Sequence, residues 1–149
     1  MTRPLLLAAA LTLAACDSSD SANIDLDALA DVLGCDAVTE VSVPFTTTGA
    51  LSASDCTFID DDGTFADYYA FEIDEAQTVT ITMRSEDVDS FLGLIGETGT
   101  AIVGDDDSGG GVTGLDAQIE RRLTAGVYVV AANSVDVETG AYTLRIQGE

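Results

Sequence analysis

The feature that most constrains this chain is an alternation of apolar and polar residues with a period of two. In residues 77–84, QTVTITMR, the apolar residues Val79, Ile81 and Met83 alternate with threonines. Such a pattern predicts a β-strand with one buried side and one solvent-facing side. Further strands are expected in the apolar segments that lie between turn-forming clusters, namely 41–49, 68–74, 91–96, 100–104, 115–123, 126–133 and 140–147.

No helical period interrupts these segments, so a parallel α/β sheet is not expected. The sequence therefore predicts an all-β fold, an antiparallel jelly-roll-like β-sandwich of about eight strands over residues 42–149. Ahead of it, residues 24–41 are expected to form a short helix and a linker. Apolar residues recur there near helical spacing, Ser21 or Asn23 offers a cap, and Gly34 offers a stop.

The first residues, MTRPLLLAAALTLAAC, place one basic residue before an apolar run that is too short to cross a bilayer. The four residues ending at Cys16 resemble the lipobox of bacterial lipoproteins. That resemblance implies a signal peptide over residues 1–15, lipidation of Cys16, and a polar tether over 16–23. We expect a bacterial cell-envelope protein that a lipid anchor holds on a membrane. The alternative is an ordinary signal peptide with a chance cysteine.

The charge balance restricts the partners of this protein. The chain has 27 acidic and 5 basic residues, no histidine, and a formal net charge of −22. Nucleic acid is excluded, because phosphate binding needs clustered Lys and Arg. The negative field repels anionic surfaces and attracts cations and basic partners. A competing explanation is that the acidity is an adaptation to a saline habitat.

Two cysteines remain when Cys16 is set aside. Cys35 and Cys56 form an even pair in an oxidising compartment, which predicts a disulfide that ties the N-terminal segment to the start of the domain. Free thiols for metal binding or catalysis are the alternative, but the chain offers no histidine partner and no C-x-x-C spacing.

Seven short motifs follow one another from Gly49 onward. They are Gly49-x-Leu51 with Asp55, Asp67-Tyr68-Tyr69-x-Phe71, the strand at 77–84, Asp89-Ser90-Phe91-Leu92-x-Leu94, the Asp105–Asp107 turn, Leu123-x-Ala125-Gly126-x-Tyr128 and Gly140-Ala141-Tyr142-x-Leu144. In this order the chain resembles the bacterial pre-peptidase C-terminal domain family. The resemblance implies a jelly-roll-like sandwich and a non-catalytic role, and related modules bind collagen or other polymers with calcium support. The aromatic set for collagen has no match here.

The acidic turns are the candidate metal site. The carboxylates in question belong to Asp87, Asp89, Asp105, Asp106 and Asp107. They flank a hairpin that brings both groups to the same end of a sheet. The favoured interpretation is that they are hydrated turn residues that accept backbone N–H groups. The alternative is that they converge on a structural Ca²⁺, which takes six to eight oxygen ligands.

Tyr68 and Tyr128 fall out of phase with the inward-facing residues of their strands. They are expected either to cover the second face of the sandwich or to form a shallow binding surface for sugars or peptide. Without histidine, Ser-His-Asp and Cys-His catalysis is excluded, and no small-molecule substrate is expected.

Together these features predict a non-catalytic cell-envelope binding module whose partner is an envelope protein or a polysaccharide. Calcium would be its only cofactor, in a structural role. One alternative is a purely structural acidic surface protein adapted to high salt. A second is a small hydrolase that uses two carboxylates.

Overall fold

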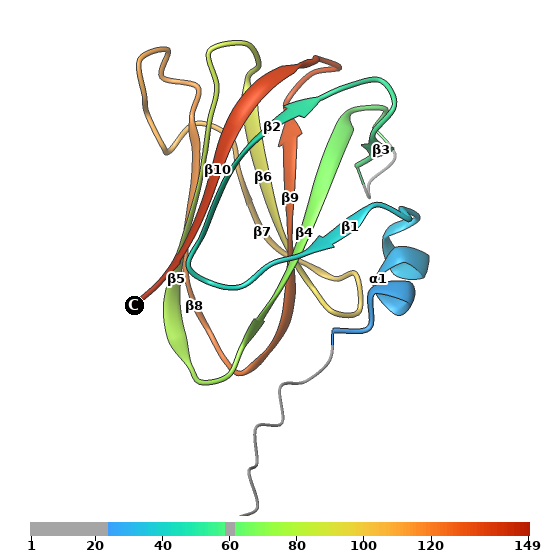
Figure 1. Ribbon diagram of the computed structural model, residues 1–149. Helices are drawn as coiled ribbons and strands as arrows, with labels where there is room; N and C mark the ends of the chain where they lie inside the picture. Colours follow the sequence, from blue (N-terminus) through green and yellow to red (C-terminus); the bar gives the residue numbers. More distant parts are fainter. Residues whose placement is uncertain (1–23, 59–61) are drawn as a thin grey trace, which may run out of the picture.

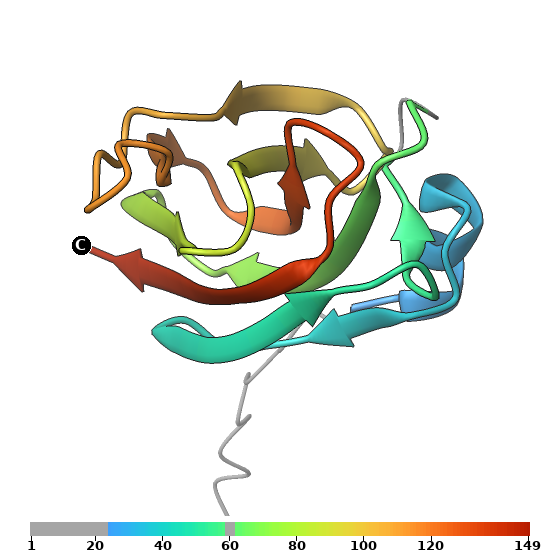
Figure 2. The same ribbon diagram turned by 90° about the horizontal axis from the view of Figure 1, so that it is seen from above.

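The computed structural model describes residues 24–58 and 62–149, and it is a sandwich of two β-sheets with a short helix on one side (Figures 1 and 2). The predicted β-sandwich is confirmed. The elements are α1 (Leu26–Leu33), β1 (Val38–Glu40), β2 (Phe45–Leu51), β3 (Cys56–Thr57), β4 (Phe65–Ile73), β5 (Gln77–Arg84), β6 (Ser90–Gly96), β7 (Ala101–Asp105), β8 (Ala117–Leu123), β9 (Gly126–Ser134) and β10 (Gly140–Gly148).

The strands form two sheets. Sheet A has the order β1-β4-β9-β6-β7, with β3 paired to β4, and sheet B has the order β2-β10-β5-β8. Eight strands correspond to the eight predicted segments. The other two, β1 and β3, are three and two residues long, too short to show a period in the sequence. β1 lies parallel to β4, with Val38 beside Tyr68, so sheet A is not purely antiparallel.

The main core lies between the sheets and follows from the alternation. Val79, Ile81 and Met83 of β5 are fully buried, as are Leu144 and Ile146 of the neighbouring β10. The residues between them point outward from sheet B and are polar, most of them threonine. Burial of one face per strand at roughly 25 cal/mol per Å² of apolar surface is the main stabilising term of such a sandwich.

A second core lies on the outer face of sheet A, beneath α1. It contains Leu29 and Leu33 of the helix together with Tyr68, Ala70 and Phe58. Sheet A is therefore covered on both faces, whereas sheet B is covered on one. Residues 24–41, expected as a helix and a linker, provide the helix and also an edge strand of the sheet.

The ends of α1 have ordinary caps. The Asp25 side chain accepts the N–H of Ala28 at 3.0 Å, and Gly34 ends the helix in the left-handed conformation with φ 66°. The predicted stop at Gly34 is confirmed. The cap is Asp25; Ser21 and Asn23 lie outside the described residues.

The predicted disulfide is confirmed. Cys35 and Cys56 are bonded, with their Cα atoms 5.6 Å apart. The bond joins the residue that follows the helix cap to β3, and β3 in turn pairs with β4. The helix is thus attached covalently to the sheet that it covers.

The membrane predictions fall at the N-terminus. The predicted signal peptide over residues 1–15, the lipidation site Cys16 and the tether to residue 23 lie outside the described residues. From Ile24 onward, the described part of the chain contains no helix that is both long and apolar enough to span a bilayer.

Candidate functional site

Three connections meet at one end of the sandwich, drawn at the top of Figure 1. They are residues 85–89, 106–116 and 135–139, and we call them together the loop end. Hydrogen bonds join them. The N–H of Asp89 donates to Glu138 Oε2 at 2.8 Å, the N–H of Val135 donates to the Asp89 carbonyl at 2.9 Å, and the N–H of Ser90 donates to the Leu115 carbonyl at 3.2 Å. The loop end is therefore a single ordered surface.

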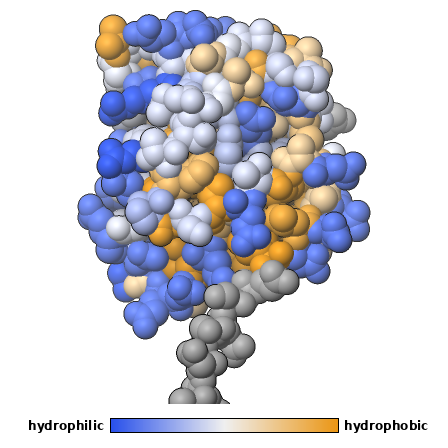
Figure 3. Space-filling model, in the orientation of Figure 1, coloured by the Kyte–Doolittle hydropathy of each residue, from blue (hydrophilic) through white to orange (hydrophobic). Residues whose placement is uncertain are grey.

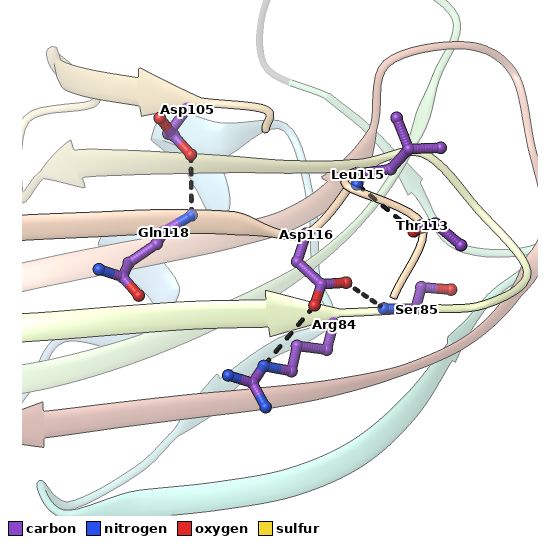
Figure 4. Close-up of polar contacts among 7 residues, drawn as sticks. All are labelled: Arg84, Ser85, Asp105, Thr113, Leu115, Asp116 and Gln118. Carbon is purple, nitrogen blue, oxygen red and sulfur yellow. Dashed lines mark hydrogen bonds and ion pairs between the residues drawn. The ribbon is translucent and has the colours of Figure 1, made fainter. Parts of the chain in front are cut away.

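Asp116 organises the longest of these loops. Its residue surface is 5% exposed, and its Oδ1 accepts the N–H of Ser85 at 3.3 Å. Its Oδ2 lies 3.7 Å from Nε of Arg84, and Figure 4 shows both interactions converging on the carboxylate. Because a buried carboxylate needs such partners, this residue fixes loop 106–116 against the end of β5.

Two of the three glycines at 109–111 lie against Asp116. A Cβ on Gly109 would lie 2.6 Å from the Asp116 carbonyl oxygen, and a Cβ on Gly111 would overlap the Asp116 carboxylate. Gly110 and Gly111 also adopt left-handed backbone with φ 69° and 76°. Glycine alone meets these demands without strain. The glycine run was the signal in the sequence that could have pointed to Asp116.

Asp105 and Asp87 act as acceptors for backbone groups. Asp105 Oδ2 accepts the N–H of Gln118 at 2.8 Å, and its Oδ1 accepts the Ser108 hydroxyl at 2.5 Å; Figure 4 shows the bond to Gln118. Asp87 Oδ2 accepts the N–H of Ala141 at 3.0 Å. These contacts are the ones expected of carboxylates that order turns.

The remaining predicted ligands lie close enough to interact. Partial burial, and then the carboxylates of Glu138 and Asp106, raise the pKa of Asp89; Asp136 and Asp107 add to the effect. Within residues 24–58 and 62–149, however, no three acidic or cysteine side chains are grouped tightly enough to hold a metal ion. The calcium site stays a prediction.

A cleft of 440 Å³ lies where loop 106–116 overhangs the outer face of sheet B. Arg84 contributes to its lining, with a side chain that is 68% exposed although it is paired with Asp116. Thr48, Thr143, Asp87 and Val112 also line it. The cleft thus offers one cation, hydroxyl groups, carboxylates and one aliphatic side chain.

The loop end also exposes aliphatic residues. Val112 is 96% exposed, Val137 62%, Val135 45% and Leu115 40%; the fifth large hydrophobic residue of this kind among the described residues is Val32 of α1. Exposed carboxylates surround them, from Glu86, Asp87, Asp106, Asp107 and Asp136. Our sequence reasoning missed these valines, because residues in loops carry no period.

The two tyrosines do not form one surface. Tyr68 is 1% exposed, belongs to the core beneath α1, and donates its hydroxyl to the Thr57 carbonyl at 3.2 Å. Tyr128 is half-buried on the inner side of sheet A, where its ring lies 5.9 Å from that of Phe71. Of the two expected alternatives, Tyr68 takes the first, because it packs in the core on the outer face of sheet A. Tyr128, expected on the same side, instead faces the main core.

Several residues of the family motifs form a polar cluster between the sheets. The Tyr142 hydroxyl donates to Asp67 Oδ2 at 2.5 Å and lies 2.7 Å from the Tyr69 hydroxyl. The ring of Tyr142 fills the space that a Cβ on Gly49 would need. Burial raises the pKa of Asp67, Tyr69 and Tyr142. The cluster fixes β2, β4 and β10 to one another.

A two-sheet sandwich of this kind has known structural counterparts, although no protein-family model and no curated protein matches the sequence. The pre-peptidase C-terminal domain of collagenase from Bacillus anthracis is similar with a TM-score of 0.58 and 17% identity, over 74% of this chain and 94% of that one. PliG from Aeromonas hydrophila, a periplasmic inhibitor of g-type lysozyme, has a TM-score of 0.52 and 15% identity, over 75% of this chain and 97% of that one. The chain has the fold of the pre-peptidase C-terminal domain, as its motifs predicted.

Proposed function

We propose that this chain is a non-catalytic binding module of the bacterial cell envelope, and that its loop end binds a protein with a basic surface. One observation carries the proposal. The loop end presents four exposed aliphatic side chains, from Val112, Leu115, Val135 and Val137, on loops that hydrogen bonds hold in place. Exposed apolar groups with a polar rim are typical of protein interaction sites.

The charge of the molecule favours a basic partner. A net charge of −22 attracts cationic proteins and speeds their encounter, while the apolar contacts provide affinity that salt does not remove. The fold is also one that a lysozyme inhibitor uses, since PliG of Aeromonas hydrophila has it. A g-type lysozyme is therefore the first partner to test.

Catalysis is not part of the proposal. The chain has no histidine. At the loop end, the carboxylates of Asp105 and Asp87 are engaged as acceptors of backbone N–H groups. A salt-adapted surface protein without any ligand is the competing explanation, and it predicts no partner at all.

Anchoring by lipid is a further part of the proposal. The lipobox-like residues before Cys16 support it. Mass spectrometry of the N-terminal peptide from the native host would detect the acyl groups. Loss of the protein from the membrane fraction in a Cys16→Ala variant is the expected result.

The test of binding compares one double variant with a matched control. Val112→Asp combined with Val137→Asp should weaken binding to a g-type lysozyme by at least about tenfold, because truncated central contacts at interfaces commonly cost over 1.4 kcal/mol. Val32→Asp alters a valine that is 43% exposed on α1, and it should leave binding unchanged. Equal losses in both proteins would reject the loop end as the interface. Absence of binding to the lysozyme and to envelope extract would favour the salt-adapted surface.

A further inference from the structure

The edge strands of the two sheets are not alike. β3, which pairs only with β4 among the described residues, has two residues. β1 has three residues, and β7 has five and adjoins a register shift between Leu94 and Ile95 of β6. β8 carries three charged residues at 120–122. β2 has seven residues, FTTTGAL, with no charge, proline or register shift. Short length, charged side chains and register irregularities are features by which proteins prevent strand pairing at exposed sheet edges, and β2 has none of them.

The register shows which backbone groups of β2 are free. On β10, the N–H of Ala141 donates to Asp87 and its carbonyl accepts from Ser85, so this residue faces the β5 side. Successive residues of an antiparallel strand alternate in direction. Tyr142, Leu144 and Ile146 therefore bond to their partners on β2, which are Gly49, Thr47 and Phe45.

It follows that Thr46, Thr48 and Ala50 direct their N–H and carbonyl groups away from β10. β2 ends its sheet, and no second strand of the described chain pairs with this side. The carbonyl of Thr48 accepts a hydroxyl from Thr47 at 3.4 Å. The edge thus presents three donors and three acceptors in the spacing of a strand.

The sandwich is also open beside this edge. Phe45 and Thr47 point inward but are only half-buried, whereas Leu144 and Ile146 on the next strand are fully buried. Val43 and Tyr69 are likewise partly exposed against the main core. Figure 3, which looks onto this side of the molecule, shows apolar surface gathered in its lower middle with hydrophilic residues around it.

Carboxylates border the opening. Hollows of 460 and 260 Å³ around Val43 are both lined by Glu72 and Asp74, with Glu75 in the larger one and Glu40 in the smaller one. A strand that pairs with β2 would place alternate side chains beside Phe45 and Thr47, which point inward and are half-buried. The acidic border favours basic residues in the same strand, and a second copy of a chain with charge −22 would be repelled.

We infer that the free edge of β2 accepts an extended segment of a partner protein, in which apolar and basic residues alternate, as an added antiparallel strand. The outward backbone groups of Thr46, Thr48 and Ala50 form the hydrogen bonds to the added strand. The open side of the sandwich determines which side chains of the partner segment are accepted. This surface adjoins the loop end, because Thr48 lines the same cleft as Val112. It differs from the loop end in binding through backbone groups of a strand edge.

The test uses a short, capped peptide of alternating lysine and valine as the probe, with an alternating glutamate and valine peptide as its counterpart. Thr48→Pro removes an outward N–H without touching the ladder to β10, and Thr48→Val keeps the backbone while it removes the hydroxyl. We expect Thr48→Pro to weaken binding of the basic peptide by about tenfold, and Thr48→Val to change it by less than about twofold. The acidic peptide should bind at least about tenfold more weakly than the basic one.

Amide hydrogen exchange gives a readout that needs no variant. The bound peptide should slow exchange at Thr46, Thr48 and Ala50, while the amides of Thr47 and Gly49 are slow with or without it. Equal affinity of Thr48→Pro and Thr48→Val, or unchanged exchange at the three outward amides, overturns the inference. Protection of these amides by raised protein concentration alone would make a second copy the occupant and overturn the assignment to a basic segment. The Val137→Asp protein, altered at a loop-end residue outside the cleft that Thr48 lines, should bind the peptide normally, which distinguishes this surface from the loop end.

Discussion

The glycine run at 109–111 offers a matched pair of substitutions. Gly110 and Gly111 both have left-handed backbone, with φ 69° and 76°. A Cβ on Gly110 meets nothing within 4 Å, whereas a Cβ on Gly111 overlaps the carboxylate of Asp116. Gly110→Ala therefore reports backbone strain alone, and Gly111→Ala reports the same strain together with displacement of that carboxylate.

The magnitudes follow from these two differences. A left-handed non-glycine residue costs about 1–2 kcal/mol, so Gly110→Ala should lower the free energy of unfolding by that amount. In Gly111→Ala the carboxylate also loses its bond from Ser85 at 3.3 Å and its approach to Arg84 at 3.7 Å. Hydrogen bonds to charged groups contribute about 1.5–3 kcal/mol, which brings the expected loss to about 2.5–5 kcal/mol.

Urea denaturation followed by circular dichroism measures both values. The cycle is completed in an Asp116→Ala background, where Gly111→Ala should cost no more than Gly110→Ala, because the group it would displace is gone. Equal losses for the two glycine variants in the natural background would refute the role of Asp116 as the residue that organises loop 106–116.

Three further predictions concern the whole domain. The cysteines of the Cys35–Cys56 bond are 21 positions apart, and reduction of this bond should lower the free energy of unfolding by about 3 kcal/mol. It should also expose α1 to protease. A urea titration and limited proteolysis, each with and without reductant, would measure the two effects. Burial raises the pKa of the Asp67 carboxyl above 3.8, so the folded state holds the proton of this carboxyl more tightly than the unfolded state does. Relative to the Asp67→Asn variant, the natural protein should therefore lose stability as the pH rises above 3.8. Thermal unfolding measured at a series of acidic pH values would test this. Molar NaCl should raise the melting temperature because it screens the net charge of −22. If millimolar CaCl₂ raises the melting temperature more than millimolar MgCl₂ does, the result would support the predicted calcium site.

The fold was predictable from the sequence to the extent that periodicity determined it. The alternation in 77–84 gives the buried face of β5 directly, because sheet B is covered on one side only. Sheet A is covered on both sides, so the alternation in β4 does not distinguish an inward from an outward residue. For that reason two alternatives stayed open for Tyr68, and the structure buries it in the core beneath α1.

The candidate site was less accessible to sequence reasoning. Asp89 interacts with Asp106 and Asp107 of the neighbouring loop, but the contacts of Asp105 and Asp87 depend on partners far along the chain. Asp105 is engaged by Gln118, and Asp87 by Ala141, 54 positions away. The buried role of Asp116 depends likewise on β5, because the bond it accepts from Ser85 spans 31 positions.

The disulfide has a mechanical consequence. Consider a force applied to the N-terminal end of the described chain, at Ile24. Once α1 has unwound, the force acts on Cys35, and the disulfide transmits it to Cys56 in β3. From β3 it acts on β4, with which β3 pairs. The closed loop between the cysteines contains both β1 and β2, so these two strands bear none of the load. At about 3.4 Å per residue, the disulfide prevents about 70 Å of chain from extending under force. Reduction of the bond would allow this length to extend, which would appear as one added step in a force–extension trace.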